Sequence, residues 1–167
     1  MRITVVAGDI TTQRVDAVVN AADVRMRGGG GVDGAIHRAG GPAVLADCVA
    51  RFPHGLATGQ AGWTTAGDLP ATWVIHVVGP NYAAGNTDRD LLTSCYRQAL
   101  AVADELGART LAFPLVSAGI YGWPLQDAVA AAVETLRATP TAVEEARLVA
   151  FGEPAFAEVS RQLAQPA

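Results

Sequence analysis

Two side chains that could act together in acid–base chemistry, Asp33 and His37, stand four residues apart, a spacing that puts both on one face of a helix. The helix would begin directly after four consecutive glycines, Gly28 to Gly31, so Asp33 would lie in its first turn. There the field of the helix favours a carboxylate. A plain first-turn acid beside a partly buried histidine would show the same spacing, so the pair alone does not establish catalysis.

The glycine run itself predicts an anion site. Bare backbone N–H groups that lead into a helix N-terminus suit an anion, and phosphate above all. A second loop, Ser117 to Gly122, follows an apolar segment and precedes another helical pattern, so it offers a second set of N–H donors. Two such loops that face each other would hold a diphosphate rather than a single phosphate. A flexible connection and an ordinary strand-to-helix turn are the simpler alternatives.

The spacing Gly29-x-Gly31-x-x-Gly34 formally matches a dinucleotide-binding fingerprint, but the match fails on its context. No strand runs directly into the glycines. About 20 residues further on, where that fingerprint places a ribose-binding acid, the chain has Pro53 and His54. We therefore do not interpret the glycines as a Rossmann motif.

The composition limits the classes of function. The chain has 167 residues, of which 50% are hydrophobic and 17% charged, which suits one domain with a sizeable core. A net charge of −4 argues against a broad basic surface and a stable nucleic-acid complex, although not against a substrate that carries a nucleic-acid end. Cys48 and Cys95 are isolated, which predicts reduced buried thiols and no metal site. With no signal peptide or membrane span in view, we expect a cytoplasmic protein that acts as a monomer.

Alternating strand and helix segments predict a three-layer α/β/α sandwich around a mostly parallel sheet. We expect strands at 3–7, 17–21, 61–65, 72–78, 110–115 and 147–151, and helices at 32–51 with a break at 40–42, 91–106, 125–137 and 155–163. Ligands bind such sheets where loops leave the carboxyl ends of strands. Three segments should lie there: 8–10, 20–33 and 117–122.

Taken in order, these motifs resemble the macrodomain family, and most closely its MacroD-type hydrolase branch. The resemblance runs nearly end to end. It is carried by Gly8-Asp9-Ile10-Thr11, Val15-Asp16-Ala17-Val18-Val19-Asn20-Ala21-Ala22, Gly28 to Gly40, Gly59-x-Ala61-x-x-Thr64, Leu69-Pro70-Ala71, Ile75-His76-x-Val78-Gly79-Pro80, Ala112-Phe113-Pro114 and Ser117 to Pro124. The family implies a mixed six-stranded sheet, with a cleft for ADP-ribose across the strand ends.

Roles carry over from the family by position. The residues expected to bind ADP-ribose are Asp9, Ile10, Asn20, Gly30, Gly31, Val32, Ser117, Ala118, Gly119, Ile120, Tyr121 and Phe156. Asp9 should accept a hydrogen bond from the adenine amino group, which a carboxylate cannot do with the carbonyl of guanine. Tyr121 should pack over the distal ribose and Phe156 against adenine, with Phe151 as the alternative aromatic.

The catalytic residues implied by the resemblance are Asp33, Asp23 and His37. Asp33 should orient or activate the attacking water near the distal ribose, and His37 should support that side of the pocket. His76, in the middle of an expected strand, is interpreted as structural. No cofactor or metal is implied, and the phosphate of the substrate itself could assist the water.

Two positions depart from the family pattern. The usual Asn-Ala-Ala-Asn is here Asn20-Ala21-Ala22-Asp23, so a pocket amide is replaced by a carboxylate. The usual Ser-Thr-Gly is here Ser117-Ala118-Gly119, which removes a hydroxyl that backbone N–H groups should make dispensable. Asp23 either alters the chemistry of the pocket or points away from it and caps a turn.

The leading hypothesis is a hydrolase that removes ADP-ribose from a protein side chain or a DNA base, or that cleaves the acetyl ester of O-acetyl-ADP-ribose. A reader that binds ADP-ribose without cleaving it is the main alternative, and a phosphatase of ADP-ribose 1″-phosphate is a third. Asp33 after the glycines favours the enzyme, whereas Asp23 favours the reader.

Overall fold

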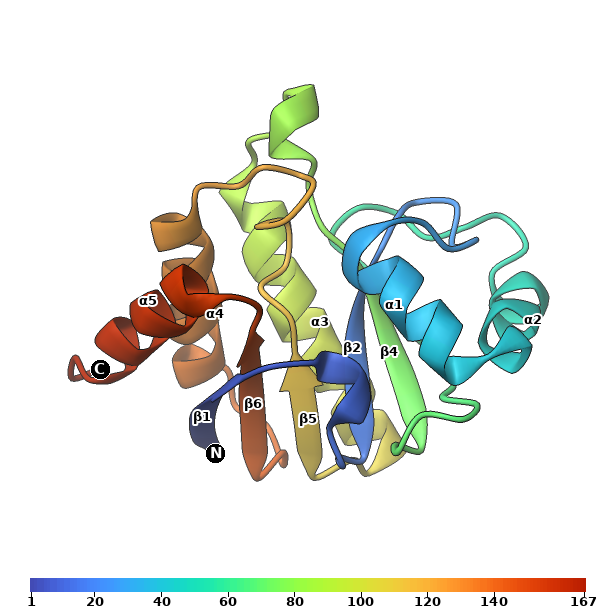
Figure 1. Ribbon diagram of the computed structural model, residues 1–167, viewed down its shortest axis with the longest axis horizontal. Helices are drawn as coiled ribbons and strands as arrows, with labels where there is room; N and C mark the ends of the chain where they lie inside the picture. The colour runs from blue at the N-terminus through green and yellow to red at the C-terminus, as the bar shows by residue number, and fades with distance from the viewer.

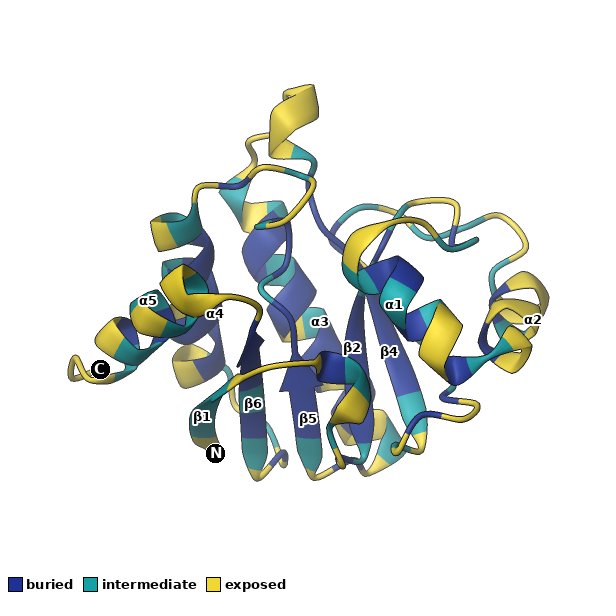
Figure 2. Ribbon diagram, viewed as in Figure 1, coloured by how far each residue is buried: buried dark blue, intermediate teal, exposed yellow.

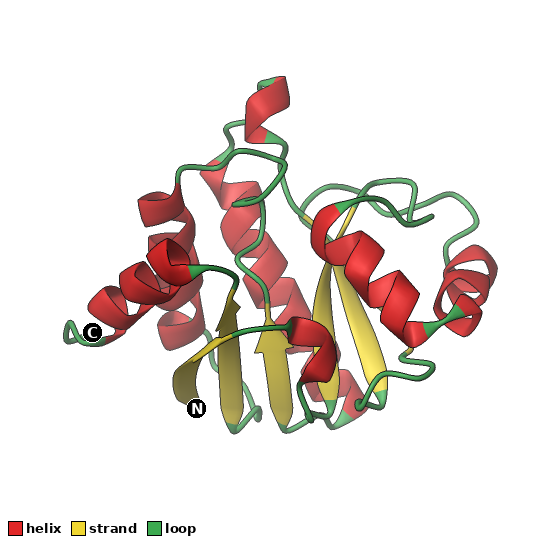
Figure 3. Ribbon diagram, viewed as in Figure 1, coloured by secondary structure: helices red, strands yellow, loops and turns green.

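The computed structural model describes residues 1–167 and has the alternation of strands and helices that the sequence predicts (Figures 1 and 3). The strands are β1 (Arg2–Ala7), β2 (Ala17–Ala22), β3 (Ala61–Thr65), β4 (Trp73–Val78), β5 (Thr110–Phe113) and β6 (Glu145–Ala150). The helices are α1 (Gly31–Gly40), α2 (Pro42–Arg51), α3 (Arg89–Leu106), α4 (Leu125–Ala138) and α5 (Glu153–Leu163). Two short 3₁₀ turns, Ile10–Thr12 and Tyr82–Ala84, were not predicted.

The strands form one six-stranded sheet in the order β1-β6-β5-β2-β4-β3. All neighbours are parallel except β3, which runs antiparallel to β4. The mixed, mostly parallel sheet is therefore confirmed. The strand boundaries differ from the prediction by one residue at β1, β2 and β4, and by two residues at one end of β5 and of β6. β5 stops before Pro114, which has no N–H for a ladder bond, and β6 begins at Glu145, where it pairs with Arg2 of β1.

Helices cover both faces of this sheet, and Figure 2 shows its strands as mostly buried. The larger core cluster joins the sheet to α3, α4 and α5, and the smaller ones lie under α1 and α2. Alternation along β2 turns Val19 toward the larger cluster, and Val18 toward the cluster under α1. Asn20 has the same parity as Val18 and so lies on the α1 side. None of the helices has the length and apolar character that crossing a membrane requires.

A chain of buried polar groups crosses the sheet on this side, because the β2–β4 register sets Asn20 beside His76. Thr64 Oγ1 donates to the carbonyl of Thr65 at 3.0 Å and can therefore accept from His76 Nε2 at 2.8 Å. His76 Nδ1 then accepts from Asn20 Nδ2 at 3.0 Å. The same amide nitrogen donates to Asp33 Oδ1 at 2.8 Å. These directions assign the neutral Nε2–H tautomer to His76.

Burial keeps the imidazole in that neutral form. His76 is fully buried, and its burial lowers its pKa to about 4, against the opposing charge of Asp33. The thiol of Cys48 lies 3.8 Å from His76 Nε2, and burial raises the pKa of this thiol to about 11. The chain of hydrogen bonds is therefore built from neutral groups until it reaches the carboxylate of Asp33.

His76 should make the stability of the fold depend on pH. An exposed histidine has a pKa near 6.5, so between about pH 6.5 and 4 the unfolded chain binds a proton that the folded chain does not. The free energy of unfolding should therefore fall as the pH drops through this window, by about 2–3 kcal/mol from this residue. In His76→Gln the loss between pH 7 and 4.5, measured by urea denaturation, should be smaller by that amount. Carboxylates titrate in both proteins, so an equal loss in the two would contradict the assignment.

Candidate active site

Asp33 occupies the first turn of α1 with its carboxylate nearly fully buried. Its Oδ1 accepts the hydrogen bond from Asn20 and lies 3.3 Å from Nε2 of His37, one turn further along the helix. Its Oδ2 lies under the glycine run, since a Cβ built on Gly29 would stand 3.3 Å from it. The carboxylate is thus oriented, with one oxygen accepting from Asn20 beside the ring of His37 and the other directed toward the glycines.

The glycine run enters α1 without any side-chain cap. Gly28 and Gly31 have positive φ, of 87° and 59°, which only glycine adopts readily. The N-cap Gly30 leaves the first-turn N–H groups of Gly31, Val32 and Asp33 without acceptors in the protein. Val32 meanwhile packs against the core cluster under α1. The run therefore presents a row of free N–H donors at the positive end of a helix.

The loop after β5 presents a second set of donors. Ser117 has a positive φ of 65° and is held by its Oγ bond to the carbonyl of Pro80, at 2.8 Å. Ala118 packs against the larger core cluster. The following N–H groups, of Gly119, Ile120 and Tyr121, have no acceptor in the protein. Consecutive free N–H groups in a strained loop form a concave site for an anion.

The structure brings these two loops together at the end of the sheet seen at the top of Figure 1. The Cδ1 of Ile120 lies 3.3 Å and 3.4 Å from where Cβ atoms on Gly30 and Gly31 would stand, although the side chain is 72% exposed. Partial burial raises the pKa of the Tyr121 phenol, and the charges of Asp23 and Asp33 raise it further. The second loop therefore lies over the glycines, with its tyrosine close to both acids.

Asp9 lies after β1 and opens a 3₁₀ turn that packs beside α1. Its Oδ1 accepts from the hydroxyl of Thr11 at 2.7 Å and from the Thr11 N–H at 2.8 Å. These two bonds, the hydroxyl first, lower the pKa of the carboxyl. Neither bond uses Oδ2, so this exposed carboxylate retains an oxygen for a ligand. Ile10 is buried and anchors the turn in the core cluster under α1.

Phe151 and Phe156, the two aromatic residues considered as partners of adenine, follow the C-terminal end of β6. Gly8 donates its N–H to the carbonyl of Ala150 at 3.2 Å, which sets the Asp9 segment beside the end of β6. Phe151 follows β6 directly and is 91% exposed. Phe156 lies in the first turn of α5, where its N–H bonds to the carbonyl of Gly152 and its side chain is half-buried.

Asp23 organises the turn that leaves β2. Its Oδ1 accepts from the backbone N–H of Arg25 at 3.0 Å and of Met26 at 3.1 Å, and its Oδ2 lies 3.7 Å from the Arg25 guanidinium. The turn-capping arrangement left open by the sequence is therefore present. The carboxylate is still close enough to Tyr121 for its charge to raise the pKa of that phenol.

Two residues that support the site, His76 and Thr64, were not assigned to it from the sequence. They hold the amide of Asn20, which in turn holds Asp33. The remaining polar atom of this buried amide, Asn20 Oδ1, has no hydrogen-bond partner. Such an atom in a folded protein calls for a partner, because an unpaired buried acceptor costs about 1–3 kcal/mol. No local sequence signal marks this series of hydrogen bonds, since it depends on the register between strands.

Known proteins resemble this chain over most of its length. Residues 19–132 match the family described as "Macro domain". The chain is 58% identical to a "Macro domain-containing protein in sno 5'region" of Streptomyces nogalater, over 96% of this chain and 91% of that protein. It is 44% identical to "O-acetyl-ADP-ribose deacetylase 1" of Pantoea vagans, over 90% of this chain and 91% of that protein.

A solved structure shares the fold. The Trypanosoma brucei macrodomain in complex with ADP-ribose superposes with a TM-score of 0.89 at 36% identity, covering 98% of this chain and 69% of that one. The family match covers most of the chain, including both donor loops and Asp33. On this evidence the chain belongs to the macro domain family.

Proposed function

We propose that this protein binds ADP-ribose between the two donor loops and hydrolyses the bond that joins the distal ribose to an acceptor. The observation that carries the proposal is the carboxylate of Asp33, which is buried, held at Oδ1 by Asn20 with His37 Nε2 3.3 Å away, and directed by Oδ2 toward the glycine run. The complex of a relative with ADP-ribose and the deacetylase name of another support the same reading.

The diphosphate would lie between the loops, where the N–H groups at 31–33 and 119–121 have no acceptors of their own. Ile120, which already contacts the glycines, would cover it. Asp9 would accept the adenine amino group through Oδ2. We keep Phe156 as the stacking partner of adenine, because a half-buried ring loses less conformational entropy on binding than the exposed ring of Phe151.

In the hydrolytic step, a water oxygen would attack C1″ of the distal ribose while the bond from C1″ to the acceptor breaks. The water proton would pass to Asp33 Oδ2 or to a substrate phosphate and from there to the acceptor atom, which leaves with the electron pair of the broken bond. His37 and Asn20 would orient the carboxylate without taking part in the bond changes. With O-acetyl-ADP-ribose, the same water would attack the acetyl carbon and release acetate.

A non-catalytic reader is the second candidate. It is favoured by the contacts of Asp23, whose two oxygens are already engaged by the turn and by Arg25. The two functions are separated by incubating the protein with O-acetyl-ADP-ribose and with Glu-, Ser-, Arg- and thymidine-linked ADP-ribose. Release of free ADP-ribose or acetate supports the hydrolase, and binding without release supports the reader.

ADP-ribose should stabilise the fold, and Gly119→Glu should abolish that effect. At about 100 times its dissociation constant, a ligand adds roughly 2.7 kcal/mol, which raises the melting temperature by about 5–10 °C for a chain of this size. Open space surrounds the Cβ position of Gly119, so the variant should fold, but its carboxylate would repel a diphosphate. A folded Gly119→Glu protein that keeps the full melting shift would place the phosphate site elsewhere.

Asp33→Ala should lower turnover by about 100-fold or more, the usual effect of losing a positioned acid–base group. Affinity for ADP-ribose should change far less, because the backbone donors and Asp9 remain. Turnover and the dissociation constant are measured on the same preparation. If both fall by the same factor, Asp33 is a binding or structural residue.

The substitution Asp23→Asn keeps the turn cap and removes the negative charge. An amide oxygen can accept the same two N–H groups, so the fold should keep its stability. We expect ADP-ribose affinity to stay within about tenfold, roughly 1.4 kcal/mol, while the order in which the linkages are cleaved changes. The order is read from initial rates on the panel of substrates. An unchanged order and pH profile would leave Asp23 as a turn cap alone.

A further inference from the structure

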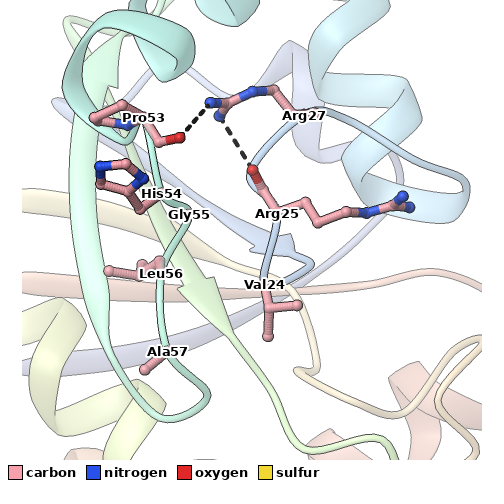
Figure 4. Close-up of a pocket in the computed structure, with 8 residues that line it drawn as sticks. All are labelled: Val24, Arg25, Arg27, Pro53, His54, Gly55, Leu56 and Ala57. Atoms are coloured by element: carbon pink, nitrogen blue, oxygen red, sulfur yellow. Dashed lines mark hydrogen bonds between the residues drawn. The ribbon is translucent and has the colours of Figure 1, made fainter.

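A hollow of about 640 Å³ lies next to the cleft, between the loop that leads into the glycine run and the loop that follows α2 (Figure 4). We call it the outer hollow, and it is lined by Val24, Arg25, Arg27, Pro53, His54, Gly55, Leu56 and Ala57. Its volume is within the range of pockets that hold small organic ligands, about 300–1,000 Å³. Neither the family pattern nor the proposed reaction assigns it a role.

The two walls of the outer hollow are joined to each other. Leu56 donates its N–H to the carbonyl of Val24 at 2.9 Å, and Arg27 bonds to the carbonyl of Pro53 at 3.4 Å. At Gly55, with φ of +76°, the chain passes so close that a Cβ would stand 2.0 Å from the Val24 oxygen. The fully buried side chain of Met26 packs beneath the first wall. The shape of the hollow is therefore fixed by main-chain contacts.

The charge of the lining is positive. Its two charged residues, Arg25 and Arg27, are both cations, and the acid that faces one of them, Asp23, lies 3.7 Å from Arg25 and outside the lining. The Arg27 guanidinium is held by the carbonyls of Arg25 and Met26, both at 3.1 Å, and of Pro53, as Figure 4 shows for the two partners it draws. Carbonyls position this cation without neutralising it. On a chain with a net charge of −4, this local excess of positive charge indicates an anionic ligand.

The uncharged part of the lining further limits the class of ligand that would fit. Val24 exposes half of its surface, and Pro53, Leu56 and the exposed ring of His54 lie on the opposite wall. A nucleotide offers a phosphate for the arginines and a flat base for such apolar and imidazole surfaces. An acidic peptide offers carboxylates for the arginines but need not present a flat ring to the rest.

The position of the hollow connects it to the reaction. Arg25 and Arg27 lie between Asp23, whose charge reaches Tyr121, and Gly28, which begins the run above Asp33. With the distal ribose beside Asp33, as in the proposed function, we expect an acceptor bonded to it to pass over this loop. We propose that the outer hollow binds the phosphodiester backbone of a nucleic-acid strand that carries the ADP-ribose. This proposal rests on the proposed function, because it assigns a substrate class to the same cleft.

Two arginines can neutralise only a few phosphates, so binding of an unmodified strand should be weak and strongly salt-dependent. This agrees with the expectation that the protein forms no stable nucleic-acid complex. The strand would be retained chiefly when its ADP-ribose occupies the cleft, because linked sites raise each other's effective concentration.

The test measures the fluorescence anisotropy of a short, labelled single-stranded oligothymidylate with the whole protein, across a salt series. We expect binding at low salt that saturating ADP-ribose does not displace. Arg25→Gln is the primary variant, because this guanidinium is 82% exposed and its one side-chain partner is Asp23. It should weaken oligonucleotide binding at least about threefold and lower the slope of log K against log salt by about 0.7. The double variant with Arg27→Gln should lower the slope by about 1.4.

Arg97→Gln is the matched control, since it changes the net charge equally on α3, which packs against the other face of the sheet. It should leave binding unchanged, as should the melting shift by ADP-ribose in Arg25→Gln. Four results would overturn the proposal: no binding, displacement by ADP-ribose, an equal loss in Arg97→Gln, or an acidic peptide that binds as tightly and is lost in the same variants. Failure of the protein to bind or cleave ADP-ribose would instead refute the proposed function.

Discussion

The hydrogen bond from Asn20 to Asp33 is the interaction on which the arrangement of the cleft depends. A buried carboxylate without partners is strongly unfavourable, so Asp33 can occupy the first turn of α1 only where donors meet it. Asn20 lies in β2, and its amide is fixed in turn by His76 on β4. The start of α1, and the glycines before it, are thereby tied to the sheet rather than to a flexible loop.

On both sides of the cleft, local contacts offset the cost of a strained backbone conformation. Met26 and Ser117 are the two non-glycine residues with positive φ, a conformation that costs on the order of 1 kcal/mol or more. Met26 is held by the cap from Asp23 and by full burial of its side chain, and Ser117 by its bond to Pro80. Loops held in this way can present their free N–H groups before a ligand arrives, which reduces the entropy lost on binding.

The sequence predicted the features that depend on local pattern, and missed those that depend on register. Alternating apolar segments placed all six strands and five helices, and glycine chemistry placed both donor loops. The link from Thr64 through His76 to Asn20 could not be seen, because it requires knowing that β2 and β4 are neighbours. His76 was interpreted as structural because its position in the chain says nothing of the amide beside it. The double role of Asp23 was likewise left open, since a carboxylate after a strand suits a cap and a pocket equally.

The donor loops and the outer hollow offer an anion different kinds of positive group, backbone N–H groups in the first and arginines in the second. The proposed chemistry of Asp33 accounts for the difference. The donor loops contain no arginine, although a diphosphate is proposed to lie between them. An arginine there would be drawn to Asp33, and an opposite charge stabilises a carboxylate and makes it a weaker base. Backbone N–H groups bind phosphate through oriented dipoles and leave the carboxylate free to accept a proton. Positive side chains lie instead in the outer hollow, beyond Asp23, where in the proposed function they would hold an acceptor without neutralising Asp33.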